Sequence, residues 1–268
     1  RLVKKKSTQH SVDDESMRGF ASMDIDLKST AEILASFAAW WILYLGSKVA
    51  LRIFPVYVSW DSVTQYKARG IVPSTAFLLL IVPASIWALA YDEELKHTRV
   101  KGKTELSNSI IAVAAGYFMY DSLIVYWHLK HDGVAYLVHG VLCMFTYLIA
   151  VMYQVYQFYG PVFLLFESTT LFVNARWLLY ELKMTSSSLY FYNGLALLLS
   201  WIFVRLVFGY SYSYFFWIDT IDAHSKGSLN FLIILWYTTA NIGLNFLNTI
   251  WFFKILKGAL RALRGKKA

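Results

Sequence analysis

GYFMYDSLIVYWHLKHDGVAYLVH (residues 116–139) contains two apolar segments separated by a short polar break. Asp121 lies within the first apolar segment, and His139 lies about two helical turns into the second. Ionisable side chains at membrane depth are costly, so a membrane protein that keeps them usually uses them for folding or for function. The stretch therefore predicts two membrane-spanning helices that carry polar groups inside the protein.

The composition of the whole chain is typical of a polytopic membrane protein. Of the 268 residues, 57% are hydrophobic and 16% are charged, whereas soluble domains are about 25% charged. The net charge is +8, much of it at the two ends of the chain. Beside apolar spans, a basic segment indicates contact with anionic lipid headgroups and not with nucleic acid. The single cysteine excludes an internal disulfide, and no spacing typical of metal ligands occurs, so we expect no metal and no bound cofactor.

Seven apolar runs are long enough to cross the bilayer, because about 20 helical residues span the ~30 Å hydrocarbon core. They predict an all-α integral membrane protein with short connections and antiparallel neighbouring helices. A polar N-terminal segment (1–30) precedes them, and a basic tail (258–268) follows. The expected spans are 31–54, 72–91, 108–129, 133–157, 160–182, 189–213 and 230–256.

The basic tail predicts the orientation. Its lysines and arginines place the C-terminus in the cytosol by the positive-inside rule, and seven spans then place the N-terminus outside. The connection 92–105 opposes this orientation, since it carries four basic residues on the outer side. We give the tail more weight.

Polar residues within the spans recur at helical spacing. In the third span, Tyr117, Asp121 and His128 share one face, and in the fifth span Glu167 shares a face with Asn174. Arg176 points away from that face, and Arg205 lies in the sixth span. An amide stripe exposed to lipid would be costly, so the stripe of the seventh span must face the bundle interior. It consists of Thr238, Asn241, Asn245 and Asn248.

Counting residues from the span ends predicts two polar layers. Asp121 would pair with His139 or Arg176 near the cytosolic side, and Glu167 would pair with Arg205 near the other side. Each carboxylate would then have a partner in the low dielectric of the bundle. Simple structural roles stay open for all five residues, because buried pairs and hydrogen bonds also fix helix register.

Three motifs resemble the TLC domain: GYFMYD (116–121), LVHG (137–140) and ESTTLFVNARWLL (167–179). The resemblance extends over roughly 55–257 and implies that the last six spans form a bundle around a polar chamber, with span 31–54 preceding it. The family includes ceramide synthases, a neuronal lipofuscinosis protein of the endoplasmic reticulum, a translocon-associated protein and plasma-membrane lipid regulators. The FxNxRW element (172–177) is closer to the branch without synthase activity.

The resemblance also shows where the chain departs from a ceramide synthase. Those enzymes carry a His-His pair in the fourth span and a His-Asp pair in the fifth. Here the corresponding residues are His139–Gly140 and Phe166–Glu167, so one histidine of each pair is missing.

The leading hypothesis is a lipid-handling protein that binds a lipid or an acyl chain within its bundle and influences membrane lipid composition, with or without turnover. One alternative is an acyltransferase in which His139 is the general base, Asp121 or Glu167 orients it, and acyl-CoA is the co-substrate. A second alternative is an accessory factor for protein export or translocation at the endoplasmic reticulum, with a membrane-protein partner. The resemblance favours the endoplasmic reticulum as location. The expected lipid-contacting residues are Tyr117, His128, Asn174, Arg176, Arg205, Asn241, Asn245 and Asn248.

Overall fold

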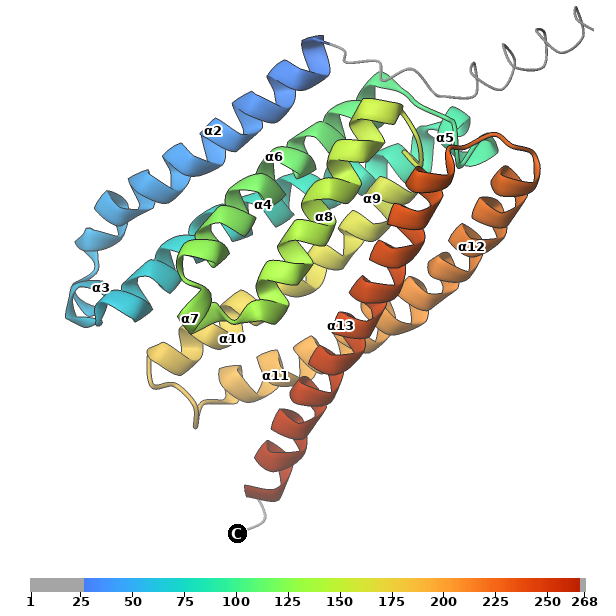
Figure 1. The fold of residues 1–268 in the computed structure, drawn as a ribbon. Coiled ribbons are helices and arrows are strands. Elements are labelled where there is room, and N and C mark those ends of the chain that lie inside the picture. Colours follow the sequence, from blue (N-terminus) through green and yellow to red (C-terminus); the bar gives the residue numbers. More distant parts are fainter. Residues whose placement is uncertain (1–26, 266–268) are drawn as a thin grey trace, which may run out of the picture.

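The computed structural model describes residues 27–265 and is all-helical over that range, without a β-strand. Figure 1 shows long helices that run up and down side by side, with the Leu27 end of the first and the C-terminal end of the last at opposite ends of the bundle. Most of the predicted polar segment 1–30, and residues 266–268 of the predicted basic tail, lie outside the described residues.

Seven helices within the described range are long and apolar enough to span a membrane, which confirms the predicted number. They are Leu27–Ile53, Ser62–Tyr91, Glu105–Trp127, Val134–Tyr153, Tyr159–Glu181, Ser188–Ser225 and Phe231–Arg261.

Several spans contain more than one element. In chain order the elements are α2 (Leu27–Ala50), η1 (Leu51–Ile53), α3 (Pro55–Ser59), α4 (Ser62–Tyr91), α5 (Glu93–His97), α6 (Glu105–Trp127), α7 (Leu129–Asp132), α8 (Val134–Tyr153), α9 (Tyr159–Leu164), η2 (Leu165–Thr169), α10 (Thr170–Glu181), α11 (Ser188–Ser200), η3 (Trp201–Phe208), α12 (Gly209–Ser225) and α13 (Phe231–Gly265).

Helix α4 begins well before the predicted residue 72, because Asp61 caps it at Ser62. The Asp61 Oδ1 atom accepts hydrogen bonds from the backbone N–H groups of Val63 (2.8 Å) and Thr64 (3.0 Å), as expected for an N-cap. The hydrogen bond from Thr64 contributes most to holding the pKa of the Asp61 carboxyl below its usual value, and the bond from Val63 acts in the same direction. The helix contains Pro83, which has no backbone N–H to donate, and continues past it to Tyr91.

Helix α8 ends at Tyr153, before the predicted residue 157, and residues 154–158 form a largely buried connection. Gln154 and Tyr156 have positive φ values of 52° and 56°, which turn the chain back toward the bundle. Gln157 is fully buried and satisfied: it accepts from Ser107 Oγ (2.7 Å) and donates to Asn108 Oδ1 (3.0 Å). The helix therefore stops where side chains of α6 offer hydrogen bonds to the connection.

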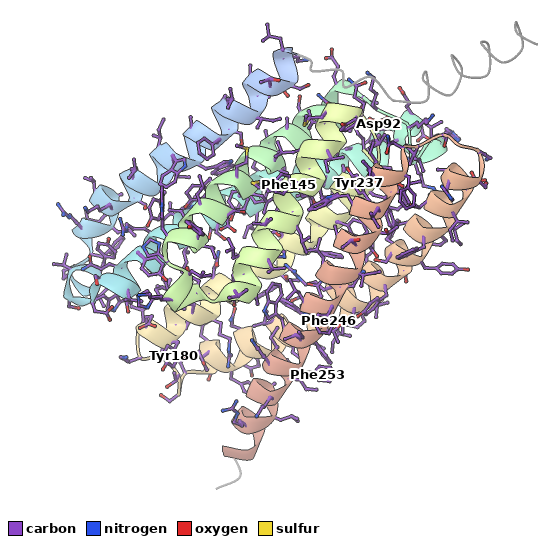
Figure 2. All side chains as sticks on the ribbon, in the orientation of Figure 1. Asp92, Phe145, Tyr180, Tyr237, Phe246 and Phe253 are labelled. Atoms are coloured by element: carbon purple, nitrogen blue, oxygen red, sulfur yellow. The ribbon has the colours of Figure 1, made fainter. Side chains whose placement is uncertain are left out.

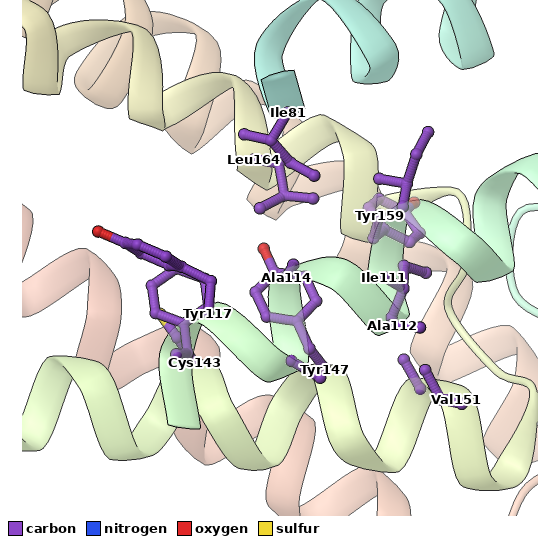
Figure 3. Packing of buried hydrophobic residues seen from close by; sticks show 14 of the residues in the cluster. Ile81, Ile111, Ala112, Ala114, Tyr117, Cys143, Tyr147, Val151, Tyr159 and Leu164 are labelled. Carbon is purple, nitrogen blue, oxygen red and sulfur yellow. The ribbon is translucent and has the colours of Figure 1, made fainter. Parts of the chain in front are cut away.

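Helix α6 is the most buried span and forms the centre of the bundle. Figure 3 shows its residues Ile111, Ala112 and Ala114 between side chains of α8, such as Tyr147, and those of α4 and α9, such as Leu164. On the side toward α2, Gly116 faces the backbone of Ile33 so closely that a Cβ atom would lie 2.6 Å from its carbonyl oxygen. The small residues of α6 thus permit close helix packing, as is common in membrane bundles.

The outer face of the bundle is apolar. Among the residues labelled in Figure 2, Phe145, Phe246 and Phe253 are 42%, 65% and 60% exposed, whereas Tyr237 is buried against α8. Exposed phenylalanines along the length of a bundle are expected where lipid tails replace water. We therefore expect the functional polar groups of the spans to lie in the interior of the bundle.

Candidate functional site

A cavity lies between α8, the fifth span, the sixth span and α13. Its volume is about 80 Å³, and one buried water needs about 10–15 Å³, so it has room for several waters or for the polar end of a larger molecule. The lining is rich in aromatic and aliphatic side chains, and its polar members come from four spans and from the connection 154–158. These polar members are His139, Cys143, Thr146, Tyr147, Tyr156, Tyr159, Glu167, Arg205, Tyr237, Asn241, Asn245 and Asn248.

Two irregular segments carry the charged residues of this cavity. Glu167 lies in η2, which is a 3₁₀-helix, and Arg205 lies in η3, which is a π-helix of eight residues. Both interrupt spans that the sequence predicted as continuous α-helices. Such interruptions within longer helices are rare, and they often occur at functional sites. The chain is therefore irregular at the two places where its charges face the cavity.

Arg205 is 5% exposed and its guanidinium is held from three directions. Nε donates to Thr169 Oγ1 (2.8 Å), Nη1 donates to Asn248 Oδ1 (2.9 Å), and Nη2 donates to the Phe166 carbonyl oxygen (3.0 Å). Its plane also lies over the ring of Trp201, 4.5 Å from the centroid. The guanidinium therefore links the fifth, sixth and seventh spans.

The predicted ion pair between Glu167 and Arg205 is wrong, since the ion pairs of the described residues do not include it. The two groups attract each other at longer range across the cavity. Glu167 is 9% exposed, and its Oε2 atom accepts a hydrogen bond from Thr170 Oγ1 (3.0 Å). Its Oε1 atom has no hydrogen bond within the described part of the chain, so it is open to a donor in the cavity.

His139 lines the same cavity as Glu167 and Arg205. Its Nε2 atom lies 3.8 Å from the Cys143 Sγ atom, and its ring contacts those of Phe118 and Trp251. The two predicted polar layers are therefore wrong: the histidine assigned to one layer and the charges assigned to the other share one chamber. Counting residues from span ends fails here because it assumes straight helices of regular rise.

Asp121 does not line the cavity. It lies at the contact between α6 and α8, where a Cβ atom at Gly140 would lie 3.6 Å from its Oδ2 atom. It is within electrostatic range of Glu167 but forms no ion pair with His139 or Arg176 among the described residues. The predicted partners of Asp121 are therefore wrong. Glu167, and not Asp121, is the carboxylate that lines the same cavity as His139.

The three asparagines of the predicted stripe in the seventh span face inward, whereas Thr238 does not line the cavity and donates to the Ile234 carbonyl oxygen of its own helix (2.8 Å). Asn241 and Asn245 both donate to Ser213 Oγ (3.1 and 2.9 Å), and Trp217 Nε1 donates to Asn241 Oδ1 (3.2 Å). Asn248 accepts from Arg205. The stripe thus joins α13 to the sixth span and also lines the cavity.

Four predicted lipid-contacting residues lie elsewhere in the bundle. Tyr117 stacks on Phe77 in the core, at a centroid distance of 3.7 Å, and His128 stacks on Tyr66 at 3.8 Å. Asn174 donates to the hydroxyls of Ser74 and Thr75 on α4, both at 3.1 Å. Arg176 lines a separate groove beside α11. Their lipid contact stays a prediction, and the site geometry does not include them.

Other residues of the site have no sequence pattern that identifies them. Thr169 and Ser213 hold Arg205 and the two asparagines, but a lone hydroxyl in an apolar run gives no distinctive signal. Tyr156 lines the cavity from the connection that was predicted as helix. Its burial raises the pKa of the phenol to about 12, so the hydroxyl stays neutral at physiological pH and can donate or accept a hydrogen bond.

Seven apolar helices around an inward polar cavity define a multi-pass helical membrane protein. The model of the TLC domain matches residues 70–257, and the chain therefore belongs to the TLC domain family. This match includes every residue that lines the cavity.

The chain is similar to several members of that family. It is 25% identical to human TLC domain-containing protein 4 and 26% identical to TLC domain-containing protein 4-A of Xenopus laevis. The alignment with the human protein covers 87% of this chain and 87% of that protein. The alignment with the Xenopus laevis protein covers 91% of this chain and 96% of that protein. An uncharacterized TLC domain-containing protein of Schizosaccharomyces pombe is 29% identical, over 62% of this chain and 56% of that protein. No solved structure matches the chain.

Proposed function

We propose that the protein binds a membrane lipid by holding the lipid's polar end in the cavity between α8, η2, η3 and α13. The observation that carries this proposal is the convergence of His139, Glu167 and Arg205 on one mostly apolar cavity. Ligand sites commonly combine an apolar lining with a few converging polar groups. Membership of the TLC domain family, with its relatives in lipid metabolism, supports the same function.

The open hydrogen-bonding groups favour a particular lipid chemistry. Three of the five N–H groups of Arg205 are used by protein acceptors, whereas Glu167 Oε1 is an unused acceptor. A lipid with hydroxyl or amide N–H groups near its head would supply the missing donor. Because the interior volume is only about 80 Å³, the hydrocarbon chains would leave the cavity between the helices.

Replacing Glu167 with glutamine is expected to reduce the amount of lipid that stays bound, roughly tenfold, because the charged acceptor for the lipid donor is lost. Native mass spectrometry of the purified protein, released from detergent, measures the retained lipid directly. Glu105→Gln is the matched control, since Glu105 is exposed at the start of α6, and it should retain lipid like the wild type. An empty wild-type bundle, or equal retention in all three proteins, would refute the proposal.

Acyl transfer is a second candidate, favoured by the presence of His139 and Glu167 in one cavity. In this reaction an amine nitrogen attacks the thioester carbonyl carbon of acyl-CoA, the C–S bond breaks, and the thiol leaves with the proton that His139 has taken up. No carboxylate of the described residues is hydrogen-bonded to the His139 ring, so Glu167 would act on it through the bound substrate.

An assay with labelled acyl-CoA and a sphingoid base tests this candidate. If the protein is an acyltransferase, His139→Ala should lower product formation about 100-fold or more, the usual contribution of a general base. His131→Ala is the control, because His131 is exposed in α7. Background counts from wild type and both variants would remove acyl transfer to that acceptor while leaving lipid binding intact.

We also infer that the C-terminal end of α13 faces the cytosol. Near its C-terminal end, α13 carries three basic side chains: Lys254, Lys257 and Arg261. Basic residues favour the cytosolic side of a span. The proposed location in the endoplasmic reticulum rests on the family resemblance.

A further inference from the structure

A second hollow lies beside α11, at the start of the sixth span. It is separate from the cavity of the proposed function. It is bounded by α10, the connection 182–187, α11 and α13, and its volume is about 560 Å³. Two cationic side chains line it, Arg176 from α10 and Lys254 from α13, together with the hydroxyls of residues 185–187. We call it the α10–α13 groove.

Arg176 is seated in this groove by two residues of α11. Its guanidinium lies over the Tyr190 ring, with the central carbon 4.2 Å from the centroid. One turn further, Gly194 leaves room for it, because a Cβ atom there would lie 2.5 Å from the Arg176 Nη1 atom. The guanidinium is therefore held in place by packing, and its N–H groups stay available for an acceptor.

The groove has an unbalanced positive charge. Neither Arg176 nor Lys254 forms an ion pair within residues 27–261, and no acidic side chain lines the groove. Two uncompensated cations facing a common space favour an anionic occupant.

The walls of the groove are apolar. Leu195, Leu198 and Ile255 line it beside the cationic groups, and Leu195 is also exposed on the outer surface of the bundle. Arg176 is five residues from the end of α10 at Glu181, which is about 8 Å along a helix. An arginine this close to the end of a span can extend its guanidinium to the level of the lipid headgroups.

We propose that the α10–α13 groove binds one anionic phospholipid. Its phosphate lies between Arg176, Lys254 and the hydroxyls of Thr185 and Ser186, and its acyl chains follow Leu195, Leu198 and Ile255 into the membrane. The Ser187 hydroxyl is already used, because it donates to the Met184 carbonyl oxygen and caps α11. This lipid is distinct from the ligand of the cavity that contains His139, and the proposal does not depend on that function. A planar guanidinium seated on an aromatic ring suits bidentate contact with phosphate oxygens.

The test uses the purified full chain in nanodiscs that contain phosphatidylcholine and phosphatidylglycerol, analysed by native mass spectrometry. The wild type should retain phosphatidylglycerol selectively over phosphatidylcholine. Arg176→Gln and Lys254→Gln should each weaken that selectivity, Arg176→Gln by roughly tenfold because it removes a charge-assisted bidentate contact. Arg52→Gln is the matched control, since Arg52 is exposed near the same end of the bundle, and it should behave like the wild type.

A third variant separates position from charge. Gly194→Ala keeps both cations but displaces the Arg176 guanidinium, and the displaced atom is the flexible end of a side chain, so the helix itself can stay in place. It should lower phosphatidylglycerol retention even if Arg176→Gln fails to fold. Equal retention by wild type, Gly194→Ala and Lys254→Gln would overturn the proposal. Displacement of the lipid by soluble glycerol phosphate at equal concentration would also overturn it, because the acyl chains would then contribute nothing.

Discussion

Replacing Arg205 with methionine is expected to lower the stability of the protein by about 3 kcal/mol or more. Methionine fills much of the same space but leaves two buried acceptors, Thr169 Oγ1 and Asn248 Oδ1, without the donors that Arg205 supplies. The Phe166 carbonyl oxygen also loses its bond from Arg205 but keeps the one from Thr169 Oγ1 (2.9 Å). Each unsatisfied buried group costs about 1–3 kcal/mol. The variant also leaves Glu167 in the cavity without its compensating cation. Thermal unfolding in detergent should shift down by roughly 5–10 °C.

Two further variants make the Arg205 experiment specific. Arg261→Met removes an exposed arginine from α13 and should leave the unfolding temperature unchanged. Asn248→Leu removes one direct partner of Arg205, so its effect should not add to that of Arg205→Met; the coupling should be about 0.5–3 kcal/mol. Strictly additive losses, or an Arg205→Met protein as stable as the wild type, would contradict the role assigned to the guanidinium.

Gly116→Ala is expected to destabilise the contact between α2 and α6 by about 1–3 kcal/mol, the usual cost of overpacking. The new methyl group would lie 2.6 Å from the Ile33 carbonyl oxygen and 2.7 Å from the Ser36 Cβ atom. Backbone atoms cannot rotate away, so α2 would have to move as a whole. That movement would also stretch the hydrogen bond from Ser36 Oγ to the Val113 carbonyl oxygen (2.9 Å). Thermal unfolding and protease sensitivity of α2 report both effects.

Gly46→Ala is the matched control for Gly116→Ala. Gly46 lies in α2, the helix that Gly116 of α6 packs against, but nothing stands within 4 Å of the position that the Cβ atom of Gly46 would take. Alanine is a better helix former than glycine by about 1 kcal/mol, so this variant should be neutral or slightly stabilising. The two Gly→Ala changes should therefore have opposite signs. Equal effects would mean that α2 does not pack against α6 as described.

The number and order of the spans could be predicted from the sequence, because hydrocarbon thickness sets the length of an apolar run. The inward direction of the α13 asparagines could be predicted for a similar reason, the cost of amides in lipid. The ends of the helices were less predictable. The start of α4 depends on the Asp61 cap, and the end of α8 depends on partners that α6 offers to Gln157.

The candidate site was predicted only in part. His139, Glu167, Arg205 and the asparagines were identified, but their pairing was not. Residues 165–169 and 201–208 contain neither glycine nor proline, so the sequence gives no sign that η2 and η3 depart from α-helical geometry. Depth along a regular helix was the only guide, and it separated His139 from Glu167. The position of the Arg176 guanidinium over the Tyr190 ring could not be predicted either, since it depends on the space that Gly194 leaves on another helix.

The π-helical segment η3 also changes the phase of the sixth span. A π-turn bonds each residue to the fifth one along, which winds the chain less tightly than an α-turn does. The halves on either side of η3 therefore need not present the same stripe of residues to the bundle. Asn193 of α11 donates to the Phe172 carbonyl of α10, whereas Thr220 of α12 is hydrogen-bonded to Tyr156. One continuous 38-residue span can thus serve two different sets of neighbours, with the change of partner falling at Arg205.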